Sequence, residues 1–176
     1  MHRKPQRIIS AYEKWSRGKL EAKVVVAFVS MWGSTRKLAE PLINAISKEG
    51  VEAVPYDLSV ADTSHIASDL VDASAIVLGA PTVLGGLHPL AVYALTLVKA
   101  LRPRLKLAAY FGSYGWSGGA ASQTKTLLEP TGCEIVGALE VKGTPGEKEL
   151  EDGRRTWAES GAEGQGKPEI TGNLLK

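Results

Sequence analysis

The chain has 176 residues, 44% of them hydrophobic, which is enough to bury one core and close to the usual size of a single domain. Its 21 basic and 19 acidic residues leave a formal net charge of only +2, which excludes a chain-wide electrostatic footprint for nucleic acid or an anionic membrane surface. The single cysteine, Cys133, excludes an internal disulfide framework and a cysteine-rich zinc or iron–sulfur cluster, and it suits a reducing compartment.

Short apolar runs rich in β-branched residues recur along the chain, as expected of strands buried on both faces of a parallel sheet. In chain order, the predicted strands cover residues 24–29, 51–56, 76–80, 105–111 and 134–141. A segment of helical character follows each strand, and the predicted helices cover residues 34–49, 64–71, 89–101, 120–128 and 147–162. The first helix is the clearest, because hydroxyl residues stand at its start and Gly50 stands just past its end.

This alternation of strands and helices predicts an α/β fold, a doubly wound sheet of five parallel strands with helices on both faces. Ligands of such sheets bind beyond the carboxyl ends of the strands, at the point where the strand order reverses. The loops after the first, third and fourth strands are therefore the candidate site. We expect this domain to cover residues 23–162, with an N-terminal lead-in over residues 1–22 and a flexible tail over residues 163–176.

The loop after the first strand, residues 30–35, is a hydroxyl-rich turn that runs directly into the start of a helix. Free backbone N–H groups and the positive end of the helix dipole bind a terminal phosphate, and Ser30, Ser34 and Thr35 can donate hydroxyl hydrogen bonds to it. The loop has neither a Walker lysine nor Gly-x-Gly-x-x-Gly spacing, which favours a mononucleotide phosphate over NAD or ATP. Taken alone, Ser34 would be an ordinary helix N-cap.

The loop after the third strand, residues 81–89, contains the adjacent glycines Gly85 and Gly86, which let the backbone approach a ligand and adopt positive φ. In a flavin site, a peptide that turns its carbonyl toward flavin N5 accepts a hydrogen bond from the reduced flavin and shifts the reduction potential. Either glycine could supply that peptide. The alternative is a strand-to-helix turn with Pro89 at the first helical position.

The loop after the fourth strand, residues 112–119, interleaves four glycines with two large aromatic residues. Aromatic faces stack on a flat heteroaromatic ring, and backbone amides beside glycines can reach its polar edge, so Tyr114 and Trp116 are the stacking candidates. Isolated aromatic residues are more often core or interface residues. The prediction therefore depends on the three loops sharing one edge of the sheet.

Together the three loops predict a cofactor site without a catalytic or metal-binding side chain. The predicted cofactor residues are Ser30, Met31, Trp32, Gly33, Ser34, Thr35, Pro81, Thr82, Val83, Leu84, Gly85, Gly86, Ser113, Tyr114, Gly115, Trp116, Ser117, Gly118 and Gly119.

Three motifs resemble, in the same order, the phosphate, isoalloxazine and distal loops of the flavodoxin-like domain of the flavodiiron proteins, also called A-type flavoproteins. They are Met31-Trp32-Gly33-Ser34-Thr35, Ala80-Pro81-Thr82 and Phe111-Gly112-Ser113-Tyr114-Gly115-Trp116-Ser117-Gly118-Gly119. Asp57-Leu58-Ser59, Leu101-Arg102-Pro103 and Val141-Lys142-Gly143-Thr144-Pro145 are also similar to that family. The resemblance spans residues 8–157.

The resemblance implies a flavodoxin-like sheet of order 2-1-3-4-5, FMN as the cofactor and electron transfer as the function. Complete members place a diiron domain ahead of the flavin domain and reduce dioxygen or nitric oxide there. This chain has no room for that domain, so oxidoreductase activity is expected only together with a diiron partner. The implied partners are a rubredoxin-like or flavoprotein donor and a diiron domain or subunit as acceptor. Family members pair head to tail, which makes a homodimer one expected assembly.

Two other functions stay open, and one departure from the family pattern supports the first of them. The family commonly has asparagines after the Pro-Thr pair, where this chain has Leu84-Gly85, and the change removes amide side chains that would contact the flavin. It favours a flavodoxin-like module without FMN that serves as a regulatory or scaffold domain. The other alternative is an NAD(P)H-dependent quinone or flavin reductase, which needs a nicotinamide pocket that no segment indicates.

The remaining residues suggest neither a metal nor a membrane. His2, His65 and His88 are scattered without the spacing of metal ligands, so we expect surface histidines and no metal. The first 23 residues carry charges throughout and lack the apolar stretch of a signal peptide or anchor. We therefore expect a cytoplasmic protein that binds neither nucleic acid nor membranes.

Overall fold

The structure is a computed structural model that describes residues 20–151. Most of the predicted lead-in and the whole predicted tail lie outside the described residues. The last predicted helix is described only over residues 147–151, which are helical. No helix among the described residues has both the length and the apolar character needed to cross a membrane.

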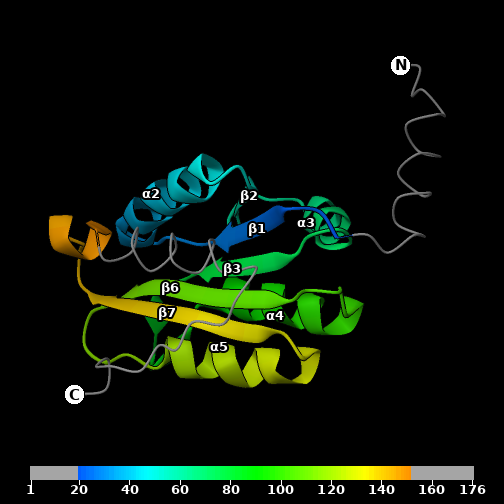
Figure 1. Cartoon of the computed structure of the whole chain (residues 1–176). Coiled ribbons are helices and arrows are strands. Elements are labelled where there is room, and N and C mark those ends of the chain that lie inside the picture. Colours follow the sequence, from blue (N-terminus) through cyan, green and yellow to red (C-terminus); the bar gives the residue numbers. More distant parts are fainter. Residues whose placement is uncertain (1–19, 152–176) are drawn as a thin grey trace.

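Five parallel strands form the central sheet, as predicted (Figure 1). They are β1 (Lys23–Phe28), β2 (Glu52–Asp57), β3 (Ala75–Gly79), β6 (Leu107–Tyr114) and β7 (Glu134–Lys142). Their spatial order is β2-β1-β3-β6-β7, which is the predicted order 2-1-3-4-5 when the five strands of this sheet are counted along the chain. The central strand β3 is buried along its whole length, as its continuous apolar sequence requires.

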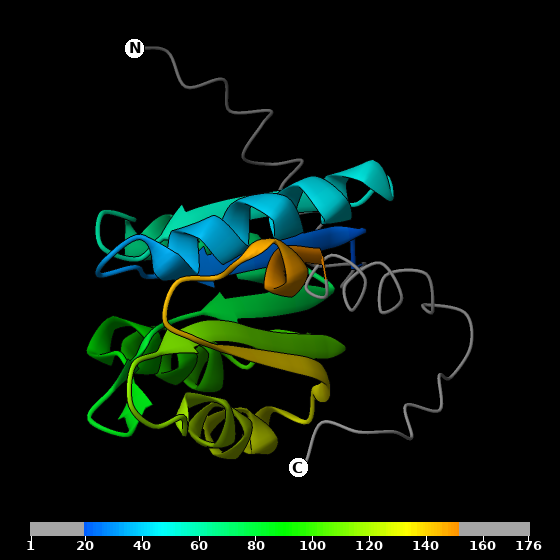
Figure 2. The ribbon, with the colours of Figure 1, turned by 90° about the vertical axis from the view of Figure 1, so that its left-hand side faces the viewer.

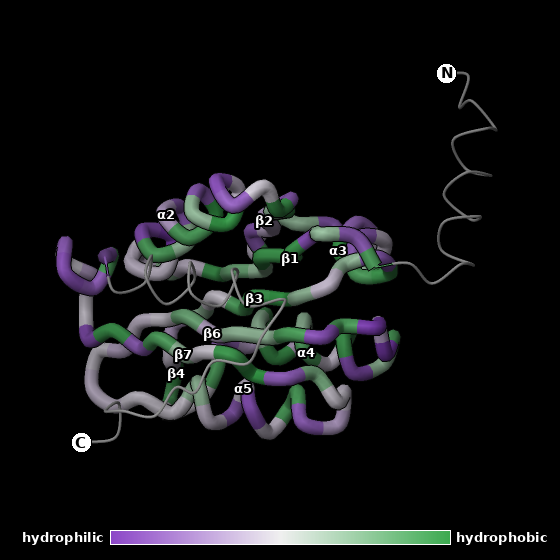
Figure 3. Tube along the Cα trace, in the orientation of Figure 1, coloured by the Kyte–Doolittle hydropathy of each residue, from purple (hydrophilic) through white to green (hydrophobic). Residues whose placement is uncertain are grey.

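Helices cover both faces of the sheet. The helix α2 (Ser34–Lys48) packs through Leu38, Ala39 and Leu42 against one face. The other face is covered by α3 (Thr63–Leu70), α4 (Pro89–Leu101) and α5 (Ala120–Leu128), the last followed by the 3-10 turn η1 (Glu129–Thr131). Figure 3 shows the hydrophobic residues concentrated along the inner strands, with hydrophilic residues prominent on the outside of α2. The sheet is therefore the middle layer of three.

Two predictions about the loops need correction. The strand predicted over residues 105–111 begins at Leu107 and continues to Tyr114, because β6 keeps parallel pairing with β7 through Lys142. Gly112 and Ser113 are therefore buried strand residues and not part of a loop. The alternative of a plain turn from β3 into α4 is wrong for the turn, because β4 (Thr82–Val83) and β5 (Gly86–Leu87) pair antiparallel as a small hairpin, but Pro89 does begin α4.

The carboxyl ends of the strands lie together, at the left-hand end of Figure 1 and facing the viewer in Figure 2. The chain passes from β1 outward to β2 and then returns to place β3 on the other side of β1, so the strand order reverses between β1 and β3. This is the position where doubly wound sheets bind ligands.

A cluster of paired charged residues lies around Lys23, at the amino end of β1 and away from these carboxyl ends. Lys23 Nζ at the start of β1 lies 2.6 Å from Asp72 Oδ1 and 3.3 Å from Asp69 Oδ1, and the Tyr56 hydroxyl also donates to Asp69. Burial lowers the pKa of Lys23, but the hydrogen bonds and charges of the two aspartates outweigh it and raise that pKa. Each buried charge has a partner, so the cluster is explained by structure alone.

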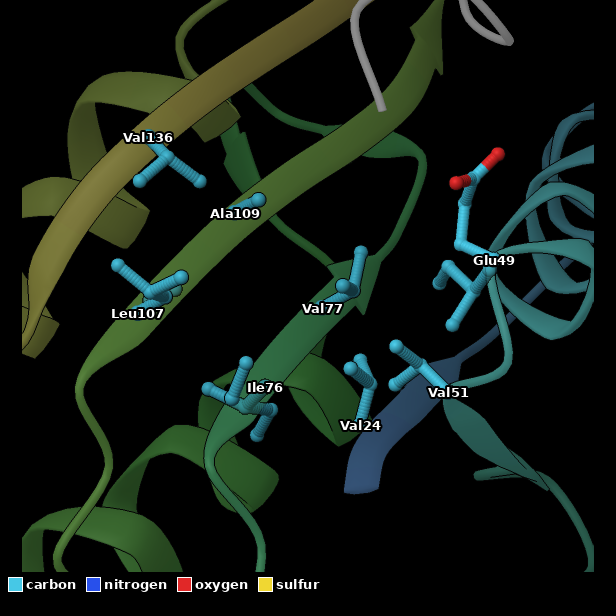
Figure 4. Close-up of a pocket in the computed structure, with 11 residues that line it drawn as sticks. Val24, Glu49, Val51, Ile76, Val77, Leu107, Ala109 and Val136 are labelled. Carbon is cyan, nitrogen blue, oxygen red and sulfur yellow. The ribbon is translucent and has the colours of Figure 1, made fainter. Parts of the chain in front are cut away.

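An apolar groove lies on the α2 face of the sheet (Figure 4). Side chains of Val24, Ile76, Leu107 and other aliphatic residues line it, and Glu49 is its one charged lining residue. It lies toward the amino ends of the strands and offers too few polar groups to orient a polar ligand. The candidate site must be at the other end of the sheet.

Candidate functional site

The structure brings the three predicted loops to one end of the sheet. Residues 29–33 connect β1 to α2, the β4–β5 hairpin follows β3, and residues 115–119 connect β6 to α5. Because β1, β3 and β6 are parallel neighbours or next neighbours, these segments lie side by side at their carboxyl ends. Two of the loops approach each other closely at Gly119 and Gly85. The Gly119 backbone lies so near the Gly85 carbonyl oxygen that a Cβ added to Gly119 would be only 2.5 Å from it.

The first loop is shaped by Ser30. Its Oγ accepts hydrogen bonds from the backbone N–H groups of Gly33, at 3.1 Å, and Arg36, at 3.4 Å. The N–H groups of Ser34 and Thr35, in the first turn of α2, have no intrahelical carbonyl partner. Ser34 is not the N-cap; that position is held by Gly33 with φ of 86° and no side-chain capping bond. The helix start thus presents unused donors to a ligand.

Thr35 carries the clearest sign that a ligand belongs in this loop. It is only 1% exposed, and its Oγ1 is a buried polar atom with no hydrogen-bond partner among the described residues. An unsatisfied buried hydroxyl costs about 1–3 kcal/mol, so native proteins rarely retain one without a use. A bound anion at this helix start would supply the missing acceptor.

Arg36, the basic residue that follows this turn in α2, is already paired. Arg36 Nη2 lies 2.5 Å from Asp57 Oδ2, and its guanidinium also lies over the Phe28 ring, 5.7 Å from the centroid. Burial raises the pKa of Asp57, but hydrogen bonds from Ser59 and the charge of Arg36 outweigh it and hold that pKa below its usual range. Neutral backbone and hydroxyl donors therefore dominate the phosphate seat.

Each of the three loops exposes large apolar side chains, and in the first loop Met31 is exposed beside Trp32. Trp32 is 91% exposed, Trp116 is 96% exposed, and Leu84 is fully exposed. A glycine follows Trp32 and Leu84 and precedes Trp116, and there is open space beside each one. A Cβ added to Gly33, Gly85 or Gly115 would meet no atom within 4 Å. Apolar side chains around open space at a topological switch point are the features of a site for a flat, partly apolar ligand.

The hairpin is fixed by residues that sequence reasoning missed. Gln123 Oε1 in α5 accepts a 2.6 Å hydrogen bond from the Leu87 N–H, and Glu140 Oε1 in β7 lies 3.5 Å from Thr82 Oγ1. The buried Tyr110 hydroxyl donates to the Ala80 carbonyl at 2.8 Å, just before the hairpin. The one available signal was an acidic residue, Glu140, among the apolar residues that lead up to the carboxyl end of the strand.

The positions of the other predicted residues vary. Ser113 is buried in β6, and the Gly119 N–H donates to Glu140 at 3.4 Å. The Ser113 side chain and the Gly119 N–H are therefore not open to a ligand in this structure. Tyr114 is half-buried, and Gly86 packs against the Gln123 side chain. His88, which sequence reasoning placed on the surface, is partly buried and caps α4 through Nδ1. No group of three or more potential metal ligands exists among residues 20–151.

Leu84 occupies an unfavourable backbone position. Its φ is 51° and that of Gly85 is 77°, both left-handed, as in the hairpin turns for which Asn-Gly is the favoured pair. We expect Leu84→Asn to raise the free energy of unfolding by about 0.5–1 kcal/mol, because asparagine tolerates this conformation better than leucine. Urea denaturation measures the effect. Val60→Asn, which replaces another exposed apolar residue without positive φ, should give no gain; an equal gain there would contradict the backbone explanation.

Comparison with known proteins agrees with this geometry. The family model described as Flavodoxin matches residues 26–157. The chain is 36% identical over 132 residues to a nitric oxide reductase of Moorella thermoacetica, covering 75% of this chain and 33% of the relative. It is 36% identical over 162 residues to a coenzyme F420H(2) oxidase of Methanothermobacter marburgensis, covering 88% of this chain and 40% of the relative.

Solved structures give the same result. The rubredoxin oxygen:oxidoreductase from Desulfovibrio gigas superposes with a TM-score of 0.80 at 29% identity, over 86% of this chain and 39% of that one. A flavodoxin from the domain Archaea superposes with a TM-score of 0.71 at 25% identity, over 80% of this chain and 97% of that one. The chain thus spans a third to two fifths of the curated relatives above, but nearly all of a free flavodoxin.

Proposed function

The chain belongs to the flavodoxin family, whose cofactor is FMN, and we propose that it is an FMN-binding electron-transfer domain, the flavin half of a flavodiiron-type oxygen or nitric oxide reductase. The observation that carries the proposal is the orphaned Thr35 hydroxyl at a helix start with free N–H groups, within a rim formed by Trp32, Leu84 and Trp116. This arrangement offers a phosphate seat and an apolar site for a flat ring at one end of the sheet.

FMN supplies the redox chemistry when it is bound, and the protein supplies binding, orientation and tuning. The N–H groups of Ser34 and Thr35 and the Thr35 hydroxyl would hold the phosphate. Trp32 and Trp116 would provide aromatic faces that pack on the ring system and exclude water from it. The hairpin, fixed by Gln123 and Glu140, would present its backbone groups to the polar edge of the ring. Electron transfer needs no general base from the chain.

The partners follow from the relatives. One is named for rubredoxin and dioxygen, one for nitric oxide and one for reduced coenzyme F420. We infer that this domain accepts electrons from a small redox protein, rubredoxin-like or itself a flavoprotein, and passes them to a diiron domain or subunit. A homodimer and a cytoplasmic location agree with this role and stay predictions, as do the domain boundaries 23–162.

Stepwise anaerobic reduction of the FMN-loaded protein tests the proposal. The protein should retain flavin after removal of free FMN, and the flavin absorption should bleach on reduction and return on mixing with an electron acceptor. Protein that retains no flavin would instead be a scaffold module, the alternative that Leu84-Gly85 favours. Sustained NADH oxidation with a quinone acceptor would show a reductase in place of a carrier.

A further inference from the structure

Glu140 lies near the carboxyl end of β7 and reaches two of the three loops. Its Oε1 accepts hydrogen bonds from the N–H groups of Gly119 and Ala121, each at 3.4 Å, and lies 3.5 Å from the Thr82 hydroxyl oxygen. A Cβ built on Gly118 would lie 3.0 Å from its Oε2, so the loop before α5 passes close over the carboxylate. One side chain thus contacts the hairpin, the loop after β6 and the start of α5.

These contacts replace a missing helix cap. The N-cap of α5 is Gly119, which has φ of 136° and no side chain to satisfy the first N–H groups of the helix. Glu140 supplies the acceptor from another strand, and a carboxylate at a helix N-terminus is also favoured by the helix dipole. In β5, the second strand of the hairpin, the Leu87 N–H donates to the side chain of Gln123, which belongs to α5. The hairpin and α5 are therefore tied at both strands.

Within residues 20–151, Glu140 forms no ion pair with a lysine or arginine. Its field also reaches the residues beneath the loops, because burial and the charge of Glu140 together raise the pKa of the Tyr110 hydroxyl. A flavin held between these loops would gain electrons in the presence of this negative charge.

The geometry points to Glu140 as a positioning residue of the flavin site: its carboxylate locks the β4–β5 hairpin to the start of α5 and makes the reduction potential of the flavin more negative. The lock follows from the hydrogen bonds, and the potential follows from repulsion between the carboxylate and the electrons added to the ring. The electrostatic part rests on the proposed function, whereas the lock exists without a cofactor.

Two variants separate the two effects. Glu140→Gln keeps an acceptor oxygen and removes the charge, while Glu140→Ala removes both. Glu134→Gln, on the exposed opposite end of β7, makes the same charge change as a control. Amide hydrogen exchange of the cofactor-free protein at Gly119 and Ala121, the two amides that Glu140 accepts from, reports the lock. FMN affinity and the midpoint potential report the site.

In Glu140→Ala, we expect the amide hydrogens of Gly119 and Ala121 to exchange about tenfold faster than in wild type, because a charge-assisted hydrogen bond is lost. For the same reason this variant should bind FMN about tenfold more weakly. Glu140→Gln should restore both. The midpoint potential of the flavin in Glu140→Gln should nonetheless be more positive than in wild type. The expected shift is up to about 59 mV, which is a tenfold change in the one-electron equilibrium constant. Glu134→Gln should match wild type throughout.

Wild-type exchange in Glu140→Ala would overturn the lock, and a wild-type potential in Glu140→Gln would overturn the electrostatic role. A wild-type chain that binds no FMN would refute the proposed function and with it the effect on the potential. The exchange result would still decide the lock, so the two failures are distinguishable.

Discussion

Gly119→Ala should lower FMN affinity about 100-fold and the free energy of unfolding by about 2–3 kcal/mol. Two causes add. The φ of 136° is a conformation that alanine rarely adopts, and the added methyl group would lie 2.5 Å from the Gly85 carbonyl oxygen, which is backbone and cannot rotate away. The hairpin must then move off α5, and the gap between the two loops changes shape. Fluorescence titration with FMN and urea denaturation measure both quantities.

Gly132→Ala is the matched control for this prediction. Gly132 also has positive φ, 74°, but a Cβ there would meet nothing within 4 Å, and the residue follows η1, outside the three loops. This variant should lose about 1 kcal/mol of stability and keep its FMN affinity. If Gly119→Ala bound FMN as tightly as wild type, the close contact between the two loops would not shape the site.

Thr35→Val should change stability and affinity in opposite directions. In the cofactor-free protein it removes an unsatisfied buried hydroxyl at nearly constant volume, so the free energy of unfolding should rise by about 1–2 kcal/mol. FMN affinity should fall about tenfold to a hundredfold, because a hydrogen bond to a charged phosphate is lost. The first quantity comes from urea denaturation without FMN and the second from FMN titration.

Thr124→Val tests whether the effect belongs to the orphaned hydroxyl. Thr124 is also 1% exposed, but its Oγ1 donates to the Ala120 carbonyl at 2.8 Å, so its loss should stabilise nothing and leave FMN affinity unchanged. A cofactor-free Thr35→Val protein no more stable than wild type would show that the hydroxyl already has a partner, such as water. Unchanged FMN affinity would remove Thr35 from the phosphate seat.

The sheet order and most helix boundaries were predictable from the sequence. The limits of α4 and α5 match the prediction, because Pro89 and the glycines before Ala120 are strong local signals. The end of β6 was not predictable, because Gly112 to Tyr114 read as a loop, and only pairing with β7 makes them strand residues. The hairpin was missed for a similar reason, since its strands have two residues each.

The site was predictable as three loops but not as a set of contacts. The order of motifs identified the loops, and parallel topology placed them at one edge. Glu140 and Gln123 were missed because they act from β7 and α5, far along the chain from the hairpin residues they hold. Their roles depend on tertiary distances, which residue spacing within a loop does not report.

Comparing FMN with riboflavin tests the central claim most directly, because the two ligands differ only in the phosphate. Equilibrium titration of the purified protein should give one FMN per chain and riboflavin binding at least about tenfold weaker, since riboflavin leaves the Thr35 hydroxyl and the helix start unsatisfied. Binding of neither ligand, or equal affinity for both, would contradict a flavin site built on this phosphate seat.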